Sequence, residues 1–199
     1  MGARRAFGEA GFTDGQVYPR RLGIAVTQLG REVDASRQLE FVKVFRGEPS
    51  PAHSPTGQAA CQRQVRFWAA QNCVEAVTRP LKYYADGWDP RAQAPKWRAQ
   101  EKGIDVLIAI AMVTGAMKNE YDVAVLMSAD TDLAPAVEQV LECGKRVEVA
   151  AWKSRDVRSR LALTGQNIWC HWLTKQWYER LHDPSDYTMP QPGDPPVNP

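Results

Sequence analysis

The chain has 199 residues, of which 44% are hydrophobic, and 25 basic against 23 acidic side chains leave a net charge of +2 at pH 7. This is the composition of an ordinary globular protein, with room for one sizeable α/β core and a tail. Because the net charge is so small, it gives no support for nucleic-acid binding, and only local basic patches could provide that support. No apolar run is long enough to span a bilayer and the N-terminus has no signal-peptide core, so we expect a soluble, cytoplasmic protein that contacts no membrane. The four cysteines have no CxxC spacing and are expected to be reduced thiols.

The first hundred residues predict two strands and a helix between them. Residues 22–39 could include a further helix, after an Asp14-Gly15 pair that is a turn signal. Residues 39–45 are rich in β-forming side chains and predict a strand, and a proline-rich loop follows over residues 46–57. The pattern then predicts a helix over residues 56–72, a second strand over 74–78, and a polar, aromatic excursion over 79–100.

Residues 104–113 are apolar almost all round, and this periodicity leaves a buried helix and a buried strand both open. Their Met, Ala and Leu content favours the helix. Towards the C-terminus, a short helix is expected over residues 156–163, and a tryptophan-rich helix that packs on the sheet over 167–181. Residues 183–199 are rich in Pro and Asp and predict a disordered tail. The expected organisation is therefore one domain over residues 1–182, followed by the tail.

Residues 121–152 carry the clearest pattern of the chain, which is strand, acidic turn, helix and strand. Residues 123–127 form an apolar run typical of a strand buried on both faces. Apolar side chains recur at helical spacing from Leu133 to Leu141, Gly144 is a good helix stop, and residues 146–152 are extended again. Such a unit crosses over right-handed and gives a parallel strand pair. Asp130 and Asp132 should therefore lie at the carboxyl end of a parallel strand, where open α/β sheets bind their ligands.

Two explanations remain open for this aspartate pair. One aspartate could cap the helix that follows, and the helix dipole favours negative charge there. However, a cap needs one residue, and two carboxylates two positions apart, next to Ser128 and Thr131, also suit Mg²⁺ or Mn²⁺ bound through oxygen ligands.

Two blocks of the sequence resemble a known family. MSADTDLAPAVEQVLECGKRVEV, from Met127, is similar to the signature half of NYN domains, and in particular to the LabA-like branch of the PIN-like ribonucleases. EKGIDVLIAIAMV, from Glu101, resembles a second block of the same family, in the same order and at about the same spacing. The resemblance implies a three-layer α/β/α PIN-like fold with a mostly parallel central sheet. It also implies metal-dependent cleavage of RNA.

The second block adds Asp105 to the candidate site. Its place inside an apolar stretch predicts a buried carboxylate that needs a partner, which could be Lys102, a helix N-terminus or a metal. In the resembled family, the equivalent aspartate faces the metal site. Asp105, Asp130 and Asp132 are therefore the predicted catalytic and metal-binding residues, with Ser128 and Thr131 in support. A cation among three such carboxylates would relieve their repulsion, activate water and stabilise charge on a phosphate.

Two departures from the family pattern bear on activity. The family opens with a strand that ends in Asp-Gly-x-Asn, and no apolar strand precedes such a motif here. MGARRAFGEAG resembles the segment that normally follows that strand, which leads to the hypothesis that the chain begins too late. In addition, Ala111 stands where this branch often carries an aspartate. Six residues rotate a helix by about 240°, so this position does not share a face with Asp105.

Single-stranded RNA is the expected partner. Basic and aromatic side chains alternate in the excursion and recur after residue 152, which is the composition of a surface that binds phosphates and stacks bases. An ordinary loop with packed aromatic rings and a solvated helix face are the alternatives. The candidate residues for RNA binding are Lys82, Tyr83, Tyr84, Arg91, Lys96, Arg98, Lys102, Lys153 and Arg155.

Three functions compete on the sequence alone. The first is a metal-dependent ribonuclease of the NYN type, and the second is a catalytically inactive relative that binds RNA or a protein. A phosphatase-like hydrolase that uses Asp130 and Asp132 as nucleophile and acid ranks third, because that class usually carries Asp-x-Asp on its first strand. An incomplete sheet would expose edges that invite pairing, so a homo-oligomer is a further expectation.

Overall fold

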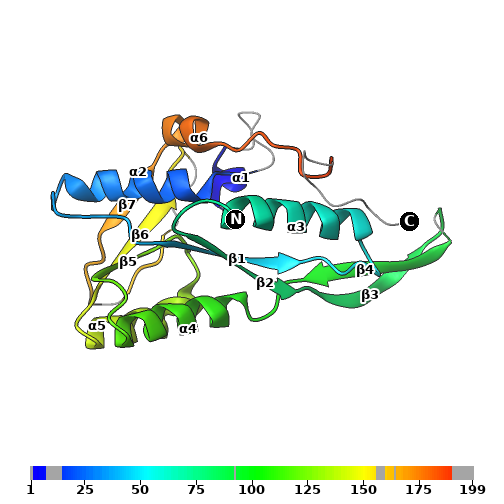
Figure 1. The fold of residues 1–199 in the computed structure, drawn as a ribbon. Helices are drawn as coiled ribbons and strands as arrows, with labels where there is room; N and C mark the ends of the chain where they lie inside the picture. Colours follow the sequence, from blue (N-terminus) through cyan, green and yellow to red (C-terminus); the bar gives the residue numbers. More distant parts are fainter. Residues whose placement is uncertain (1, 8–14, 92, 156–159, 164, 190–199) are drawn as a thin grey trace. The chain divides into compact units, whose positions relative to one another are not determined.

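The computed structural model describes residues 2–7, 15–91, 93–155, 160–163 and 165–189 (Figure 1). The chain divides into two compact units. Unit 1 comprises Met1–Val42 and Asp105–Pro184, and unit 2 comprises Lys43–Ile104 and Ser185–Pro199. Asp14, expected in a turn, lies outside the described residues. None of the described helices is both long enough and apolar enough to cross a membrane.

Unit 1 is built on a parallel sheet of three strands. The strands are β5 (Val123–Leu126), β6 (Arg146–Trp152) and β7 (Cys170–Leu173), and β6 lies between the other two. Both strand pairs are parallel, with Leu126 opposite Val149 and Val149 opposite Cys170. Five of the seven side chains between Arg146 and Trp152 are apolar, and six are buried, as expected for a central parallel strand. The predicted α/β class with parallel pairing is confirmed.

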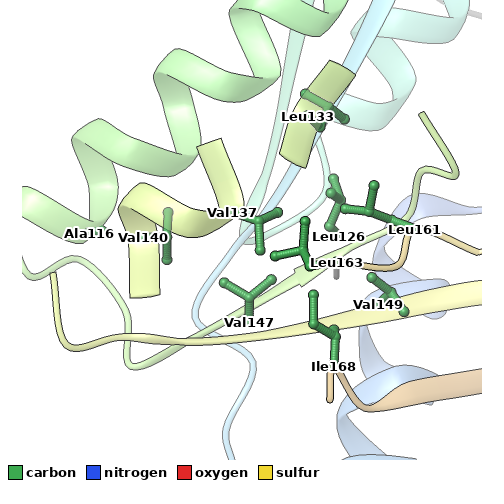
Figure 2. Packing of buried hydrophobic residues seen from close by; sticks show 10 residues of the cluster. All are labelled: Ala116, Leu126, Leu133, Val137, Val140, Val147, Val149, Leu161, Leu163 and Ile168. Atoms are coloured by element: carbon green, nitrogen blue, oxygen red, sulfur yellow. The ribbon is translucent and has the colours of Figure 1, made fainter. Parts of the chain in front are cut away.

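Alternate side chains of β6 supply two hydrophobic cores, one on each face of the sheet. Val147 and Val149 pack with α4 (Ile104–Met117) and α5 (Ala134–Glu142), together with Leu161 and Ile168 (Figure 2). On the other face, Ala150 and Trp152 pack with α1 (Gly2–Phe7), α2 (Pro19–Arg31) and α6 (Lys175–Leu181). Figure 1 shows these helices on either side of β5, β6 and β7. Unit 1 is thus a three-layer α/β/α arrangement.

Four predicted helices of unit 1 can be compared with the structure. The helix favoured over residues 104–113 is present as α4, and a helix within residues 22–39 is present in α2, which begins earlier, at Pro19. The helix expected over residues 167–181 is wrong in its first half, where β7 joins the edge of the sheet before α6 begins. Of the helix expected over 156–163, residues 160–163 are not helical, and 156–159 lie outside the described residues.

The end of α5 is fixed by Gly144, as its sequence predicts. Gly144 has φ +77°, its N–H donates to the Leu141 carbonyl (2.9 Å), and the N–H of Lys145 donates to the Val140 carbonyl (3.3 Å). These two bonds form the Schellman motif, in which a left-handed residue satisfies the last carbonyls of a helix.

We expect Gly144→Ala to lower the free energy of unfolding by about 1 kcal/mol. A Cβ at this position would meet no atom within 4 Å, so the cost comes from the left-handed backbone alone. Urea unfolding should show the loss, whereas Gly144→Asn should recover part of it because asparagine tolerates this conformation. Equal stability of the alanine variant and the wild type would contradict this account.

Unit 2 contains a helix, a strand pair and a separate hairpin. β1 (Val42–Glu48) pairs with β2 (Val74–Pro80), and α3 (Pro55–Ala69) packs on β2 with Cys61 and Trp68 buried. These elements confirm the two predicted strands and the predicted helix. The proline-rich loop begins later than expected, because β1 continues to Glu48. The excursion expected over residues 79–100 is an antiparallel hairpin of β3 (Lys82–Asp89) and β4 (Ala94–Gln100).

The segment after α6 is described as far as Met189, and its residues make contacts within each unit. In unit 1, Asp183 is fully buried and its N–H donates to the Gln16 carbonyl (3.3 Å). In unit 2, Arg63 donates to the Tyr187 carbonyl (3.0 Å), and the Tyr187 ring lies 6.1 Å from that of Phe67. Residues 183–189 thus make these contacts, residues 190–199 lie outside the described residues, and the disorder expected over 183–199 stays a prediction.

Candidate functional site

The acidic turn lies at the carboxyl end of β5, as predicted from the strand-turn-helix pattern. Asp130 caps the 3-10 helix η2 (Thr131–Leu133): its Oδ1 accepts the N–H of Asp132 at 3.0 Å. The N–H of Asp130 in turn donates to Ser128 Oγ (3.1 Å), so the Ser128 hydroxyl contacts the backbone of the turn. The side chain of Asp130 is half-buried, whereas those of Thr131 and Asp132 are exposed.

Leu133 anchors this turn to the core. It follows Asp132 directly, is fully buried, and belongs to the same hydrophobic cluster as Val147 and Val149 of β6 (Figure 2). Pro135 stands in the first turn of α5, where it needs no hydrogen-bond acceptor. The chain therefore passes from an edge strand through a capped turn into a packed helix, and this passage places Asp130 and Asp132 between β5 and α5.

Asp105 lies in the first turn of α4, and its side chain is exposed rather than buried. The apolar character of residues 104–113 predicted burial, but α4 leaves several apolar side chains in solvent, with Val106 and Ile110 more than half exposed. Within the described part of the chain, no three His, Cys, Asp or Glu side chains are grouped so that they could hold a metal ion. The structure thus brings Asp130 and Asp132 together and does not bring Asp105 into a three-carboxylate cluster with them. Ala111 is half-buried farther along the same helix.

The pair at the end of β5 fits a hard divalent cation by its donor chemistry. Carboxylate oxygens are the ligands of Mg²⁺ and Mn²⁺, and Mg²⁺ is usually bound through one or two carboxylates plus waters and substrate phosphate. One oxygen of Asp130 accepts the Asp132 N–H, while the other has no partner among the described residues. The pair therefore has the donor chemistry of a Mg²⁺ or Mn²⁺ ligand set, with one Asp130 oxygen left open.

The basic candidates divide between the two units. In unit 1, Lys153 and Arg155 follow β6, so they lie at the same edge of the parallel sheet as the acidic turn. The Lys153 ammonium sits 5.9 Å from the centre of the Trp172 ring, and Arg155 is exposed. The other candidates belong to unit 2, where Lys102 is exposed in the turn before α4, and Lys82, Tyr83, Tyr84, Arg91, Lys96 and Arg98 lie on the β3–β4 hairpin.

Unit 1 contains a triad of interacting side chains, Arg37, Glu148 and His171, that the sequence pattern did not predict. Arg37 donates two hydrogen bonds to Glu148 on β6, at 2.6 and 2.5 Å, and His171 Nε2 on β7 lies 2.7 Å from the same carboxylate. Burial alone would raise the pKa of Glu148, but the bonds from Arg37 and His171 outweigh it and lower this pKa to about 2. An ionised carboxylate only accepts, so His171 Nε2 carries the proton. The available sequence signal was an acidic residue inside an otherwise apolar strand.

A three-layer α/β domain with paired carboxylates at the carboxyl end of a parallel strand has the architecture of a PIN-like nuclease domain. The family model of the NYN domain matches residues 10–164, and the chain belongs to the NYN family. No curated protein and no solved structure matches the chain. The family assignment therefore depends on the family model, together with the fold of unit 1.

Proposed function

We propose that this protein is a metal-dependent ribonuclease of the NYN type, from its LabA-like branch. The observation that carries the proposal is the position of Asp130 and Asp132. They follow a parallel strand within a family related to PIN-like nucleases, and their geometry is held by Ser128 and by the cap of η2. Carboxylates at this end of a parallel sheet stand where such folds bind their ligands.

The roles of the residues follow from their positions. Asp130 and Asp132 would hold Mg²⁺ or Mn²⁺, with Asp105 as a further catalytic candidate. When bound, the cation supplies a Lewis acid that activates water and neutralises charge on the scissile phosphate. Ser128 keeps the Asp130 backbone in the turn. Lys153, at the same edge of the sheet, adds a positive charge that attracts the phosphate backbone.

A second candidate function is an NYN protein that binds RNA or a protein partner without cutting. The observation that favours it is Ala111 on α4, where the resembled branch often carries an aspartate. A missing carboxylate would weaken metal binding through the local charge. The two functions differ in one measurable property, which is metal-dependent cleavage.

The proposal is tested by incubating the purified protein with a 5′-labelled single-stranded RNA, in Mn²⁺ or Mg²⁺ and in EDTA. We expect fragments with either metal and intact RNA in EDTA, because the cation supplies the activated water. Cleavage that persists in EDTA would contradict a metal-dependent mechanism. Intact RNA in every condition, with a folded protein that still binds it, would establish the second candidate instead.

A further inference from the structure

The β3–β4 hairpin of unit 2 sorts its side chains onto two chemically different faces. Cross-strand partners share a face of the ladder, and alternate residues along one strand occupy opposite faces. Tyr83 pairs with Ala99 and Ala85 with Trp97, whereas Lys82 pairs with Gln100 and Tyr84 with Arg98. One face, here called the aromatic face, therefore carries Tyr83 and Trp97. The other, here called the cationic face, carries Lys82, Tyr84, Lys96 and Arg98.

A β-bulge assigns Trp88 to the aromatic face. The register shifts between Ala85 and Trp88, so that two residues of β3, Asp86 and Gly87, stand opposite Lys96 alone. Gly87, the second of these two residues, has φ +92°, a left-handed backbone conformation that glycine adopts at no steric cost. After the bulge, Trp88 pairs with Pro95. Without the extra residue, the alternation of β3 would place Trp88 on the cationic face.

On the aromatic face, Tyr83 and Trp97 already pack against another side chain of unit 2, His53. The His53 ring stacks on Tyr83 at 4.1 Å between centroids and lies 4.7 Å from the Trp97 ring. The Tyr83 hydroxyl also accepts the N–H of Ser50 at 3.1 Å. These contacts explain the aromatic side chains of this face by packing within unit 2, and they leave Trp88 exposed near the tip.

The cationic face is open and carries unpaired charge. Lys82, Lys96 and Arg98 are exposed, and none of the three has an ion pair among the described residues. Tyr84, opposite Arg98, is 43% exposed. Residues two apart in a strand are spaced by roughly 7 Å, so Lys96 and Arg98 form a short row of positive charge beside an exposed ring. This face also carries two carboxylates towards the tip of the hairpin. Asp89 accepts the N–H of Arg91, and Asp86 lies across from Lys96.

We infer that the cationic face of the β3–β4 hairpin binds single-stranded RNA, with Lys82, Lys96 and Arg98 on its phosphates and Tyr84 stacked on a base. Charge complementarity selects a polyanion, and an exposed ring flanked by cations is the arrangement that binds unpaired bases. Double-stranded RNA offers no exposed base to Tyr84. The inference rests on the proposed function for its choice of RNA, and it assigns substrate binding to side chains of unit 2, whereas Asp130 and Asp132 belong to unit 1.

Binding is measured separately from cleavage by working in EDTA. The full chain is titrated into a fluorescently labelled oligouridylate of roughly 12 nucleotides, and anisotropy is recorded from about 50 to 200 mM salt. The test variant is Lys82→Gln/Lys96→Gln/Arg98→Gln. Its matched control, Arg20→Gln/Lys118→Gln/Lys175→Gln, removes the same charge from exposed positions of unit 1. Circular dichroism verifies that each variant is folded.

The test variant should bind RNA at least about 10-fold more weakly than the wild type. Its slope of log affinity against log salt should be smaller by about 2, because three phosphate contacts contribute roughly 0.7 each. The control should keep the wild-type slope. Asp86→Asn should strengthen binding, since it removes an opposing charge from the same face. Equal losses in test and control, or no loss in the test variant, would overturn the inference.

Two aromatic variants test which face is used. Tyr84→Ala should weaken binding roughly 5-fold or more through lost stacking, whereas Trp88→Ala, on the opposite face, should leave affinity unchanged. The reverse result would overturn the assignment of the face. A wild type that binds RNA through this face without cutting it would remove the proposed nuclease and retain this inference. Metal-dependent cleavage with an unchanged KM in the test variant would support the proposed nuclease and overturn this inference.

Discussion

Asp130→Asn is expected to lower metal-dependent RNA cleavage by roughly 100-fold or more, with little change in stability. Asparagine caps a helix about as well as aspartate, so the bond from the Asp132 N–H to the side chain of residue 130 can persist. What the substitution removes is the negative charge that attracts a divalent cation. Initial rates of fragment release over a Mn²⁺ titration would measure the loss.

The matched control for this variant is Asp122→Asn. Asp122 precedes β5, at the opposite end of the strand from Asp130. Its side chain is 90% exposed, and its ion-pair partner Lys145 also donates to Asn119 Oδ1. Because the substituted carboxylate lies in solvent and Lys145 keeps a hydrogen-bond acceptor, cleavage should stay at the wild-type rate and stability within about 1 kcal/mol of the wild type. Similar activity of Asp130→Asn and Asp122→Asn would exclude the end of β5 as the catalytic centre.

Glu148→Gln is expected to lower the free energy of unfolding by roughly 3–5 kcal/mol. The substitution keeps the shape of the side chain but removes the carboxylate that contacts the guanidinium of Arg37, whose side chain is only 11% exposed. Asp34, at 4.0 Å, is then the remaining counter-charge of Arg37, and a largely buried charge that loses its close partner is costly. Urea unfolding would measure the change. Glu179→Gln on α6, an exposed residue paired with Lys175, is the matched control and should cost under about 1 kcal/mol. A loss of this small size at Glu148 would contradict the role given to the triad.

The same carboxylate predicts how stability depends on pH. Folding lowers the pKa of Glu148 from 4.5 to about 2, because the bonds from Arg37 and His171 outweigh the effect of burial. A lowered pKa adds stability that is present above pH 4.5 and is lost as the pH falls towards 2. This contribution is roughly 3 kcal/mol. The stability difference between wild type and Glu148→Gln should therefore shrink as the pH falls from 5 to 2. A difference that stays constant over this range would refute the linkage.

The sequence could predict those elements whose signal is local. The strand, acidic turn, helix and strand of residues 121–152 were predictable because an apolar run, two aspartates and Gly144 follow one another within a short stretch. The strand β7 was not predictable in this way. Its four residues, Cys170–Leu173, adjoin the tryptophan-rich α6, and a short apolar run does not distinguish a strand from a helix.

For the candidate site too, the sequence could group only those residues that are close to one another along the chain. Ser128, Asp130 and Asp132 lie within a stretch of five residues, so the pattern alone places them in one turn. Asp105 depends on which side of α4 faces the core, and a helix that is apolar nearly all round does not reveal this from its sequence. The triad was beyond sequence reasoning, because Arg37 and Glu148 are 111 positions apart and their contact exists only in the folded unit.

That separation has a consequence for the order in which unit 1 forms. Its first segment, Met1–Val42, is followed by the whole of Lys43–Ile104 from unit 2 before the rest of unit 1 begins. At a synthesis rate of about 5–20 residues per second, Arg37 is made roughly 6–20 s before Glu148. Throughout that interval α2 has neither β6 nor β7 to pack against, and its buried face, with Ala25 and Val26, is uncovered. The N-terminal helices of this protein must therefore wait for its last strands, and the nascent chain exposes apolar surface while they do.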